Sequence, residues 1–267
     1  GKMVKLIGID MDGTLLNPQS KLSEENIKAI KYATSKGIDV VIASGRPVCE
    51  SMRDYYKLLG LKSYYVGFNG AVVYDFETDT ILYQKGITGK DVKELEKFKS
   101  QFSSVNSHAF ILDTVLYEVE DYYVDLEVKV NYVKKKKIKF NDLADDFPVI
   151  KYMFTGSKVD IDNIINHVPE ELKEKYNVVR SATYYLEFVN KEVDKARGIE
   201  IIAKKKSIAK KEIMTIGDEG NDYLMVKEAG LGIAMGNARQ KVKDVAKDIT
   251  ESNANNGVAH AIYKYIK

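Results

Sequence analysis

The chain has 267 residues, a length that fits one large domain or two domains of moderate size. Hydrophobic residues make up 45% and charged residues 30%, the balance of ordinary globular proteins, which excludes a disordered or fibrous protein. The 41 Lys and Arg side chains nearly cancel the 39 Asp and Glu side chains. The resulting net charge of +2 gives no indication of a nucleic-acid or membrane partner.

The single cysteine, Cys49, cannot form an internal disulfide, which indicates a reducing compartment. No apolar run approaches the roughly 20 residues that a membrane-spanning helix needs. The first residues also lack the long apolar segment of a signal peptide. We therefore expect a cytoplasmic protein that binds neither a membrane nor nucleic acid.

The first third of the chain alternates strands with helices. Three short apolar runs are predicted to be strands: Lys5–Asp10, Ile38–Ala43 and Tyr64–Phe68. Ser23 is placed to cap a helix that Gly37 ends, and Pro47 is predicted to start a second helix. Strands that alternate with helices imply right-handed crossovers and a parallel sheet.

The last third resumes this alternation. We predict two strands, Glu212–Ile216 and Leu231–Met235, and helices over Ala196–Lys205, Tyr223–Ala229, Gln240–Ala246 and the C-terminus. Residues 1–84 and 190–267 are therefore expected to form one α/β domain with a doubly wound, Rossmann-like parallel sheet.

Residues 85–189 differ in kind, because polar and apolar residues alternate there at a period of two. This alternation predicts strands over Thr114–Val119, Val124–Val130 and Tyr184–Phe188, with helices over Asp91–Phe102 and Asp160–Val168 between them. The pattern is typical of a mostly antiparallel sheet with helices on one face, inserted as a separate α+β domain. We interpret the run Lys134–Lys137 as a solvated loop of this insert rather than a phosphate-attracting rim.

Two aspartates lie at the carboxyl end of the first predicted strand, in the sequence Asp10-Met11-Asp12-Gly13-Thr14. In an open parallel sheet, ligands bind at this carboxyl edge, beside the point where the strand order switches. Gly13 permits a turn through which the two carboxylates converge. Crowded carboxylates repel each other unless a cation or a proton compensates them, and Mg²⁺ suits a site that also holds phosphate.

A second acidic pair, Asp218 and Asp222, follows a later predicted strand and so lies at the same sheet edge. No His or Cys is near either pair in the sequence, which favours Mg²⁺ over zinc. The three histidines lie apart without the spacing of metal ligands, and we assign them to packing or the surface: His108, His167 and His260.

Two further positions are expected at this edge. Ser44 and Gly45 follow the second predicted strand and precede a helix, so a hydroxyl and backbone N–H groups can form a phosphate cradle. Lys195 opens the helix after the insert and can neutralise a phosphoryl oxygen. Taken alone, Ser44 or Lys195 could equally be a surface residue. Both residues lie at points where the chain rejoins the parallel sheet, and this makes them candidates for phosphate binding.

Other patterns carry less weight. The glycine spacing that begins at Gly230 imitates a dinucleotide fingerprint, but it forms a predicted strand where the fingerprint opens a helix. Cys49 lies on a predicted helix, and we interpret it as an inert thiol. The eighteen tyrosines are assigned mainly to packing, with Tyr184 and Tyr185 kept as candidates for substrate contact.

Together these residues resemble the four motifs of the haloacid dehalogenase superfamily of phosphohydrolases. The matching residues are DMDGT from Asp10, Ser44 within IASGR, Lys195, and the GDEGND stretch that contains Asp218. The motif order and the long insert resemble the Cof-type branch, whose large C2-type cap domain lies at that point.

Further tracts extend the resemblance over nearly the whole chain. FNGA, GIAMGNA and NGVAHAI look like the Cof-type branch. In the insert, Ser107–Tyr117 and Lys173–Phe188 are similar to bacterial YidA-type sugar phosphatases. One departure is Ala196, where the family usually has glycine after the lysine, and Gly198 can supply the flexibility instead.

The resemblance implies a role for each acidic residue. Asp10 would be the nucleophile that becomes an aspartyl-phosphate. Asp12 would protonate the leaving alkoxide and then take a proton from the hydrolytic water. Mg²⁺ would be held by Asp10, the backbone carbonyl of Asp12, and Asp218. Asp222 would orient bound water or Lys195 without ligating the cation.

The resemblance also implies how substrate is bound. Ser44, the Gly45 N–H and Lys195 would hold the transferring phosphoryl group, and Asn221 and Asn69 would line the site more loosely. The implied substrate is a small phosphate ester, with sugar phosphates favoured, and the cap would set its identity. We expect a monomer or weak homodimer, with cap movement about hinges near 83–86 and 190–193.

Three alternatives stay open. A hexose-phosphate mutase or other phosphotransferase also pairs a nucleophilic aspartate with an acid and a cap. A receiver-type signalling protein also accepts a phosphoryl group on aspartate, but a switch gains nothing from an acid at Asp12. A binding protein with an inactive site is disfavoured, because every residue expected in the site is present.

Overall fold

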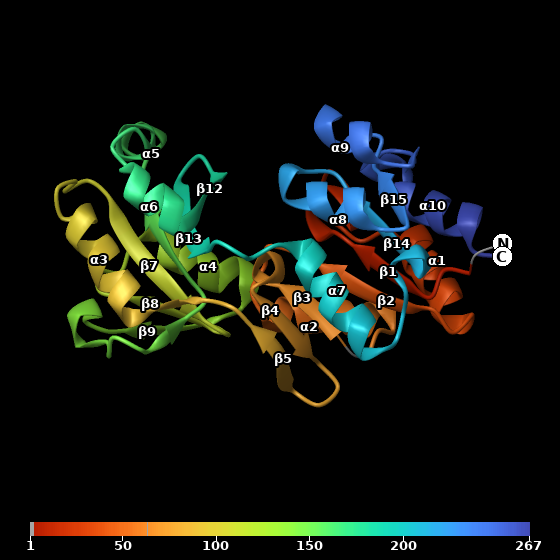
Figure 1. The fold of residues 1–267 in the computed structure, drawn as a ribbon, viewed down its shortest axis with the longest axis horizontal. Coiled ribbons are helices and arrows are strands. Elements are labelled where there is room, and N and C mark those ends of the chain that lie inside the picture. The colour runs from red at the N-terminus through yellow and green to blue at the C-terminus, as the bar shows by residue number, and fades with distance from the viewer. Residues whose placement is uncertain (1–2, 63) are drawn as a thin grey trace. The chain divides into compact units, whose positions relative to one another are not determined.

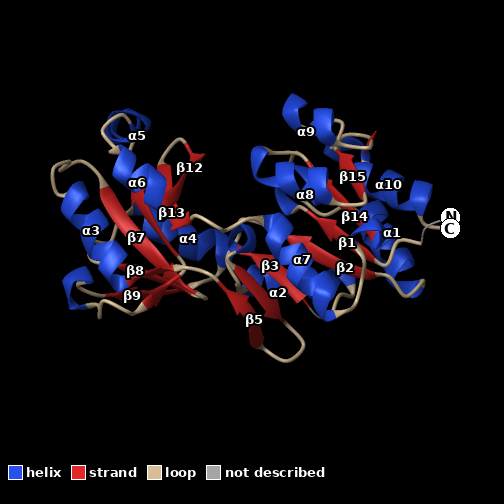
Figure 2. Cartoon of the chain, viewed as in Figure 1, coloured by secondary structure: helices blue, strands red, loops and turns tan. Residues whose placement is uncertain are grey.

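The computed structural model describes residues 3–62 and 64–267, which form two compact units (Figures 1 and 2). The first unit comprises the chain up to Arg46, Arg53–Tyr83 and Asp194–Lys267. The second comprises Pro47–Met52 and Gln84–Val193. The chain therefore leaves the first unit twice, briefly over Pro47–Met52 and then for the long segment from Gln84 to Val193. The assignment of the units as catalytic domain and cap stays a prediction.

The first unit is built on an eight-stranded sheet with the order β16-β15-β14-β1-β2-β3-β4-β5. Its parallel strands are β1 (Leu6–Ile9), β2 (Asp39–Ala43), β3 (Tyr64–Gly67), β14 (Ile213–Gly217), β15 (Leu231–Ala234) and β16 (Asp248–Ile249). This mostly parallel α/β sheet confirms the predicted fold class. The strands β4 (Val72–Asp75) and β5 (Thr80–Gln84) were not predicted, and β4 is antiparallel to β3.

Helices flank this sheet and close its apolar core (Figure 2). They are α1 (Glu24–Ser35), α2 (Glu50–Leu59), α7 (Lys195–Lys205), α8 (Tyr223–Glu228), α9 (Gln240–Val245) and α10 (Gly257–Tyr265). As predicted, the Ser23 hydroxyl caps α1 by accepting from the Asn26 N–H at 3.2 Å.

The prediction that a helix starts at Pro47 is wrong, because α2 begins at Glu50. The carbonyl of Arg46, which would be an early acceptor of that helix, is engaged elsewhere. It accepts the Phe68 N–H at 3.0 Å and the Tyr65 hydroxyl at 2.8 Å. These bonds tie the end of β2 to β3 and delay the helix.

The strand order switches direction around β1. The chain proceeds from β1 to β2 and β3 on one side, and after the second unit it adds β14, β15 and β16 on the other. Ile9 is in register with Ile216 of β14 and Ile42 of β2, so the residues that follow these strands emerge at one edge. Ligand sites of open α/β sheets lie at such a switch point.

The second unit has a six-stranded sheet with the order β12-β13-β11-β7-β8-β9. Its strands are β7 (Asn106–Ile111), β8 (Thr114–Tyr117), β9 (Lys134–Lys137), β11 (Lys151–Thr155), β12 (Tyr176–Ala182) and β13 (Tyr185–Asn190). A separate pair joins β6 (Ile87–Thr88) and β10 (Pro148–Val149). All pairs in the six-stranded sheet are antiparallel except β8 with β9, which confirms the predicted α+β insert.

Three helices of this unit are α3 (Gly89–Lys99), α5 (Lys158–Ile165) and α6 (Glu170–Lys175). Buried residues of α3 and α5 and of the sheet form one apolar core, which includes Val92, Leu95, Ile161, Phe154 and Phe188. This core gives the unit its own interior, as expected of a separate domain.

The prediction of a strand over Val124–Val130 is wrong, because this segment is the helix α4 (Tyr122–Asn131). The Asp121 carboxylate caps it by accepting the N–H groups of the second and third residues that follow. The buried positions are Val124, Glu127 and Asn131, which is helical spacing. Valine and leucine alternate with charged residues over 124–130, which is why a strand was predicted. The helical spacing was hidden because two of the three buried residues are polar.

Lys134–Lys137 is not the predicted loop but the edge strand β9, which pairs in parallel with β8. All four lysines are exposed, as the solvated interpretation required. Charged side chains on an edge strand hinder pairing with the edge of another molecule. Lysine runs are therefore compatible with a strand at this position, although they are poor strand formers elsewhere.

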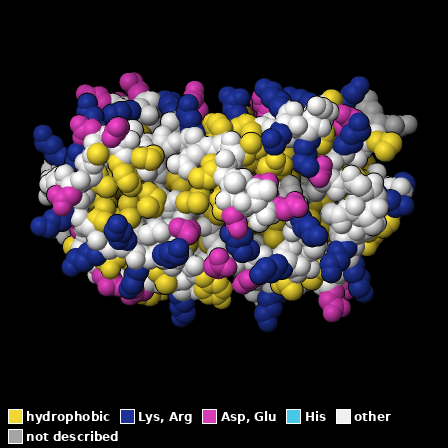
Figure 3. All heavy atoms as spheres, turned by 90° about the horizontal axis from the view of Figure 1, so that it is seen from below, with side chains coloured by type: hydrophobic (Ala, Val, Ile, Leu, Met, Phe, Trp, Pro, Cys, Tyr) yellow, Lys and Arg dark blue, Asp and Glu magenta, His cyan; other side chains and the backbone are white. Residues whose placement is uncertain are grey.

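Within residues 3–62 and 64–267, no helix has both the length and the apolar character needed to span a membrane. The face shown in Figure 3 carries basic and acidic side chains intermingled on each unit. This mixture agrees with the near-neutral net charge of the sequence.

Candidate active site

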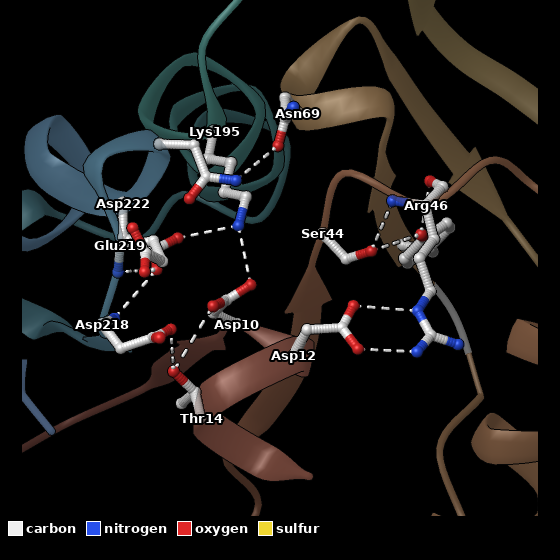
Figure 4. A network of polar contacts seen from close by, with 12 residues as sticks. Asp10, Asp12, Thr14, Ser44, Arg46, Asn69, Lys195, Asp218, Glu219 and Asp222 are labelled. Carbon is white, nitrogen blue, oxygen red and sulfur yellow. Dashed lines mark hydrogen bonds and ion pairs between the residues drawn. The ribbon is translucent and has the colours of Figure 1, made fainter. Parts of the chain in front are cut away.

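Loops from four elements of the first unit meet beyond the carboxyl edge of its sheet (Figure 4). Asp10 follows β1, Ser44 follows β2, and Asp218 follows β14. Lys195 is the first residue of α7, and the Asp194 carboxylate caps that helix by accepting the Ala196 N–H at 2.7 Å. These distant parts of the sequence therefore converge at one place.

The centre of the site is a fully buried ammonium group between two carboxylates. Lys195 Nζ donates to Asp10 Oδ1 and to Asp222 Oδ1, at 2.7 Å each. Although burial opposes the charge of the lysine, these two carboxylates raise the pKa of Lys195. The lysine is therefore a fixed positive charge next to Asp10.

The three aspartates of this cluster have different pKa shifts. Burial, and next the negative charge of Asp222, raise the pKa of Asp10 well above its ordinary value, despite Lys195. Burial also raises the pKa of Asp218. Burial opposes ionisation of Asp222 as well, but the charge of Lys195 and several hydrogen bonds lower the pKa of that carboxyl.

Thr14 joins two of the aspartates. Its hydroxyl lies 2.8 Å from Asp218 Oδ1 and 3.4 Å from Asp10 Oδ2. The turn before it needs glycine, because Gly13 has a φ of 78° and an added Cβ would lie 2.2 Å from Asp218 Oδ2. Gly13 thus gives Asp218 the room to approach Asp10.

Asp10, Asp218 and Asp222 each offer an oxygen, and these oxygens lie within 4.8 Å of one another. Asp222 is already engaged, because its Oδ1 accepts from Lys195 and its Oδ2 accepts the N–H groups of Asp218 and Glu219 at 2.9 and 3.1 Å. The buried triad fits a divalent cation, which prefers oxygen ligands. Asp10 and Asp218 retain the oxygens available to such an ion.

Asp12 does not join this triad. Its carboxylate is 60% exposed and turns toward Arg46, away from the other aspartates (Figure 4). Arg46 Nη2 donates to Asp12 Oδ1 at 2.7 Å, and Nε donates to Oδ2 at 3.0 Å. Asp10, Asp218 and Asp222 therefore lie together as expected, whereas Asp12 is paired with Arg46 outside the triad.

Ser44, which follows β2, and Asn69, which follows β3, lie at the same edge of the sheet (Figure 4). The Asn69 N–H donates to the Ser44 carbonyl at 2.9 Å, and Asn221 Nδ2 donates to Asn69 Oδ1 at 3.0 Å. Gly45 lies against Asn69, since an added Cβ would be 3.2 Å from Asn69 Oδ1. The helix N-terminus expected beside Ser44 is not there, because α2 starts at Glu50.

Sequence reasoning gave no role to three residues that shape the site. Thr14 lies in the DMDGT stretch and Arg46 in IASGR, so a position beside candidate residues is the signal that the sequence offers for them. Asn237, in the loop after β15, donates to the Gly13 carbonyl at 2.9 Å and accepts the Asn253 N–H at 2.9 Å. It supports the turn that carries Asp12.

Comparison with known proteins agrees with this geometry. Residues 7–262 match the haloacid dehalogenase-like hydrolase family. The Bacillus subtilis protein YxeH is 32% identical, over 99% of both chains. A second protein of that organism, the 5-amino-6-(5-phospho-D-ribitylamino)uracil phosphatase YcsE, is 30% identical, over 98% of this chain and 96% of its own.

Among solved structures, a haloacid dehalogenase-like hydrolase from Bacteroides thetaiotaomicron is similar, with a TM-score of 0.87 and 29% identity. The similarity covers 98% of this chain and 99% of that one. It therefore includes both units, and the superfamily resemblance predicted from the motifs is confirmed. The chain belongs to the haloacid dehalogenase-like hydrolases and is a phosphatase of that superfamily.

Proposed function

We propose that this protein is a Mg²⁺-dependent phosphomonoester hydrolase that acts through an aspartyl-phosphate on Asp10. The observation that carries the proposal is the setting of Asp10. Its Oδ1 is fixed 2.7 Å from Lys195, and the carboxylate shares the buried triad with Asp218. A carboxylate held beside a fixed cation is suited to attack an anionic phosphoryl group.

In the first half of the reaction, an oxygen of Asp10 attacks phosphorus and forms a new oxygen–phosphorus bond. The bond from phosphorus to the ester oxygen breaks, and Asp12 gives that oxygen a proton, so an alcohol leaves. In the second half, water attacks the same phosphorus and gives a proton to Asp12. The bond to Asp10 breaks, and inorganic phosphate and the free carboxylate are released.

Mg²⁺ is the cation that we propose for the triad. Asp10, Asp218 and the backbone carbonyl of Asp12 would hold it, and the ion would neutralise charge on the phosphoryl oxygens. The triad consists of carboxylates alone, which suits Mg²⁺ better than a softer metal. Asp222 would act by holding Lys195 and the backbone of the loop after β14.

The phosphoryl group would be bound by Lys195, the Ser44 hydroxyl, the Gly45 N–H and Asn221. Lys195 is a fixed point charge, and Asn69 restrains the Asn221 amide through the 3.0 Å hydrogen bond between them. Donors that are already in place stabilise charge without a cost of reorganisation during the reaction.

Small phosphorylated metabolites are the proposed substrates, with sugar phosphates favoured by the resemblance of the second unit to YidA-type sugar phosphatases. YcsE, a relative of similar length, is named for a phosphorylated ribitylaminouracil, so substrates differ among the relatives. We propose that residues 84–193 determine the choice of substrate, as cap domains do in this superfamily.

A phosphate-release screen with sugar phosphates, nucleotides and cofactor phosphates, with and without EDTA, tests the proposal. We expect release that EDTA abolishes and excess Mg²⁺ restores. Formation of glucose 6-phosphate from glucose 1-phosphate, without free phosphate, would indicate a mutase instead.

Asp10→Asn should abolish turnover while the fold survives, because the amide is a poor nucleophile. Asp244→Asn is the matched control, since Asp244 is an exposed residue that accepts from Gln240 at 2.8 Å. Retention of more than a few per cent of activity in Asp10→Asn would contradict the assignment of the nucleophile.

A further inference from the structure

The Asp12 carboxyl is the proposed acid, yet both of its oxygens are bound outside the reaction centre. Arg46 binds them through Nη2 and Nε, at 2.7 and 3.0 Å. Both oxygens of the Asp12 carboxyl face Arg46 and turn away from Asp10 (Figure 4). The orientation in the structure is therefore not the one in which Asp12 delivers a proton.

Arg46 is the fixed member of the pair. Its N–H donates to the Ser44 hydroxyl at 2.8 Å, and its carbonyl accepts from Tyr65 and Phe68. The guanidinium carbon lies 5.9 Å from the centre of the Tyr55 ring, and the side chain is only 17% exposed. The hydrogen bonds fix the backbone of Arg46, and the Tyr55 ring and the low exposure restrict the movement of its guanidinium.

Asp12 is the member that can move. Its side chain is 60% exposed, and its backbone is extended, with φ of −71° and ψ of 128°. Rotation about its Cα–Cβ bond would turn the carboxyl without any change in the β1 loop. Because exchange between the two orientations breaks one pair of hydrogen bonds, it is compatible with repeated turnover.

We propose that Arg46 is a latch on Asp12: the bidentate pair holds the acid away from the reaction centre, in exchange with an orientation in which the carboxyl faces the phosphoryl group. The inference rests on the proposed role of Asp12. It assigns Arg46 as a positioning residue, which acts on the reaction through the orientation of another side chain. The latch slows those reactions that need the acid, because a fraction of Asp12 stays bound to Arg46.

The test compares an alkyl phosphate, glycerol 2-phosphate, with p-nitrophenyl phosphate. The alkoxide of the first needs a proton as it leaves, whereas p-nitrophenolate leaves readily without one. Loss of the latch should therefore raise the ratio of kcat for the alkyl substrate to kcat for the aryl substrate. Because exposed ion pairs are weak, we expect a rise of about twofold to fivefold.

Arg46→Gln removes the bidentate pair. Arg46→Lys keeps the positive charge but offers a single point of contact, so the ratio of the Arg46→Lys variant should lie between those of the wild type and Arg46→Gln. Arg53→Gln is the matched control, because it removes an arginine of the same unit that pairs with Asp79 at 2.8 Å. We expect Arg53→Gln to keep the wild-type ratio. Thermal unfolding of each variant reports whether it is folded.

An Arg46→Gln ratio equal to or below that of the wild type would overturn the latch, as would an equal loss with both substrates. In an Asp12→Asn background, Arg46→Gln should leave the ratio unchanged, because the latch has no acid to hold. Failure of the proposed function is distinct, since it would appear as turnover by Asp10→Asn whatever residue stands at position 46.

Discussion

The Lys195 side chain has no exposed surface, and its ammonium group lies 2.7 Å from oxygens of both Asp10 and Asp222. A buried ion pair adds little net stability, because desolvation of the charges offsets their attraction. Removal of one partner is costly, however, since the remaining charges are then buried and uncompensated. Lys195 is therefore required by its neighbours even before any substrate binds.

We expect Lys195→Met to lower the free energy of unfolding of the metal-free protein by about 3–5 kcal/mol, because it leaves two buried carboxylates facing each other. Lys206→Met is the control, since Lys206 forms a partly exposed pair with Asp39, and its loss should cost less than about 1 kcal/mol. Urea unfolding with EDTA measures both. Similar midpoints for the two variants would refute this account of Lys195.

The sequence allows the positions of the candidate residues at the sheet edge to be predicted, because strand ends can be recognised. It does not allow the direction of their side chains to be predicted. Asp10 and Asp12 are two residues apart and both follow β1, yet only Asp10 points into the triad. The partner of Asp12 could not be predicted, because Arg46 is placed by the bonds of its backbone to Tyr65 and Phe68.

Five consecutive residues after β1, Asp10 to Thr14, supply several groups of the site. Gly13 and Gly37 have nearly the same positive φ, 78° and 79°. Their surroundings differ, since an added Cβ would meet Asp218 at 2.2 Å in one case and nothing within 4 Å in the other. Comparison of the two glycines separates backbone strain from loss of space in the site.

We expect Gly37→Ala to cost about 1 kcal/mol of stability from strain alone and to leave Mg²⁺ dependence unaltered. Gly13→Ala should show the same strain and also push Asp218 away from Asp10. The Mg²⁺ concentration needed for half-maximal activity should then rise at least about tenfold, because a metal ligand that loses its correct orientation binds the ion more weakly. Equal Mg²⁺ dependence of both variants would show that Asp218 tolerates displacement.

Whole elements were predictable where their apolar spacing was complete. The helices α1 and α7 and the strands β2 and β14 match their predicted ranges closely. The helix α4 was not recognised, because its buried face includes Glu127 and Asn131, which hydrophobic spacing does not count. Strand β9 was not recognised, because four exposed lysines have no apolar alternation that would indicate a strand. Only its pairing with β8 defines it.

At the scale of the molecule, the triad links the protonation of the site to the stability of the fold. The pKa of Asp10 and Asp218 is raised, so the folded metal-free protein binds protons more tightly than the unfolded chain at these residues. Stability from them is present at acid pH and is lost as the pH rises from about 3.9 through the raised values. A bound cation would remove this loss by taking the place of the proton.

We therefore expect Mg²⁺ to raise the thermal unfolding temperature more at neutral pH than at about pH 5, since protons compete with the ion at low pH. A concentration 100 times the dissociation constant stabilises by about 2.7 kcal/mol. Calorimetry with Mg²⁺ or EDTA at both values measures the difference. Asp218→Asn should abolish the shift, and Asp244→Asn should retain it. A shift that does not change with pH would argue against proton displacement.

The central place of β1 has a consequence for biosynthesis. This strand is made well before its neighbour β14, which ends at Gly217, and the whole second unit is translated between them. At about 5–20 residues per second, one edge of β1 would wait on the order of 10–40 s for its partner on the ribosome. An apolar strand with an open edge is prone to aggregate. Nascent chains of this protein should therefore depend on ribosome-associated chaperones until the last third emerges.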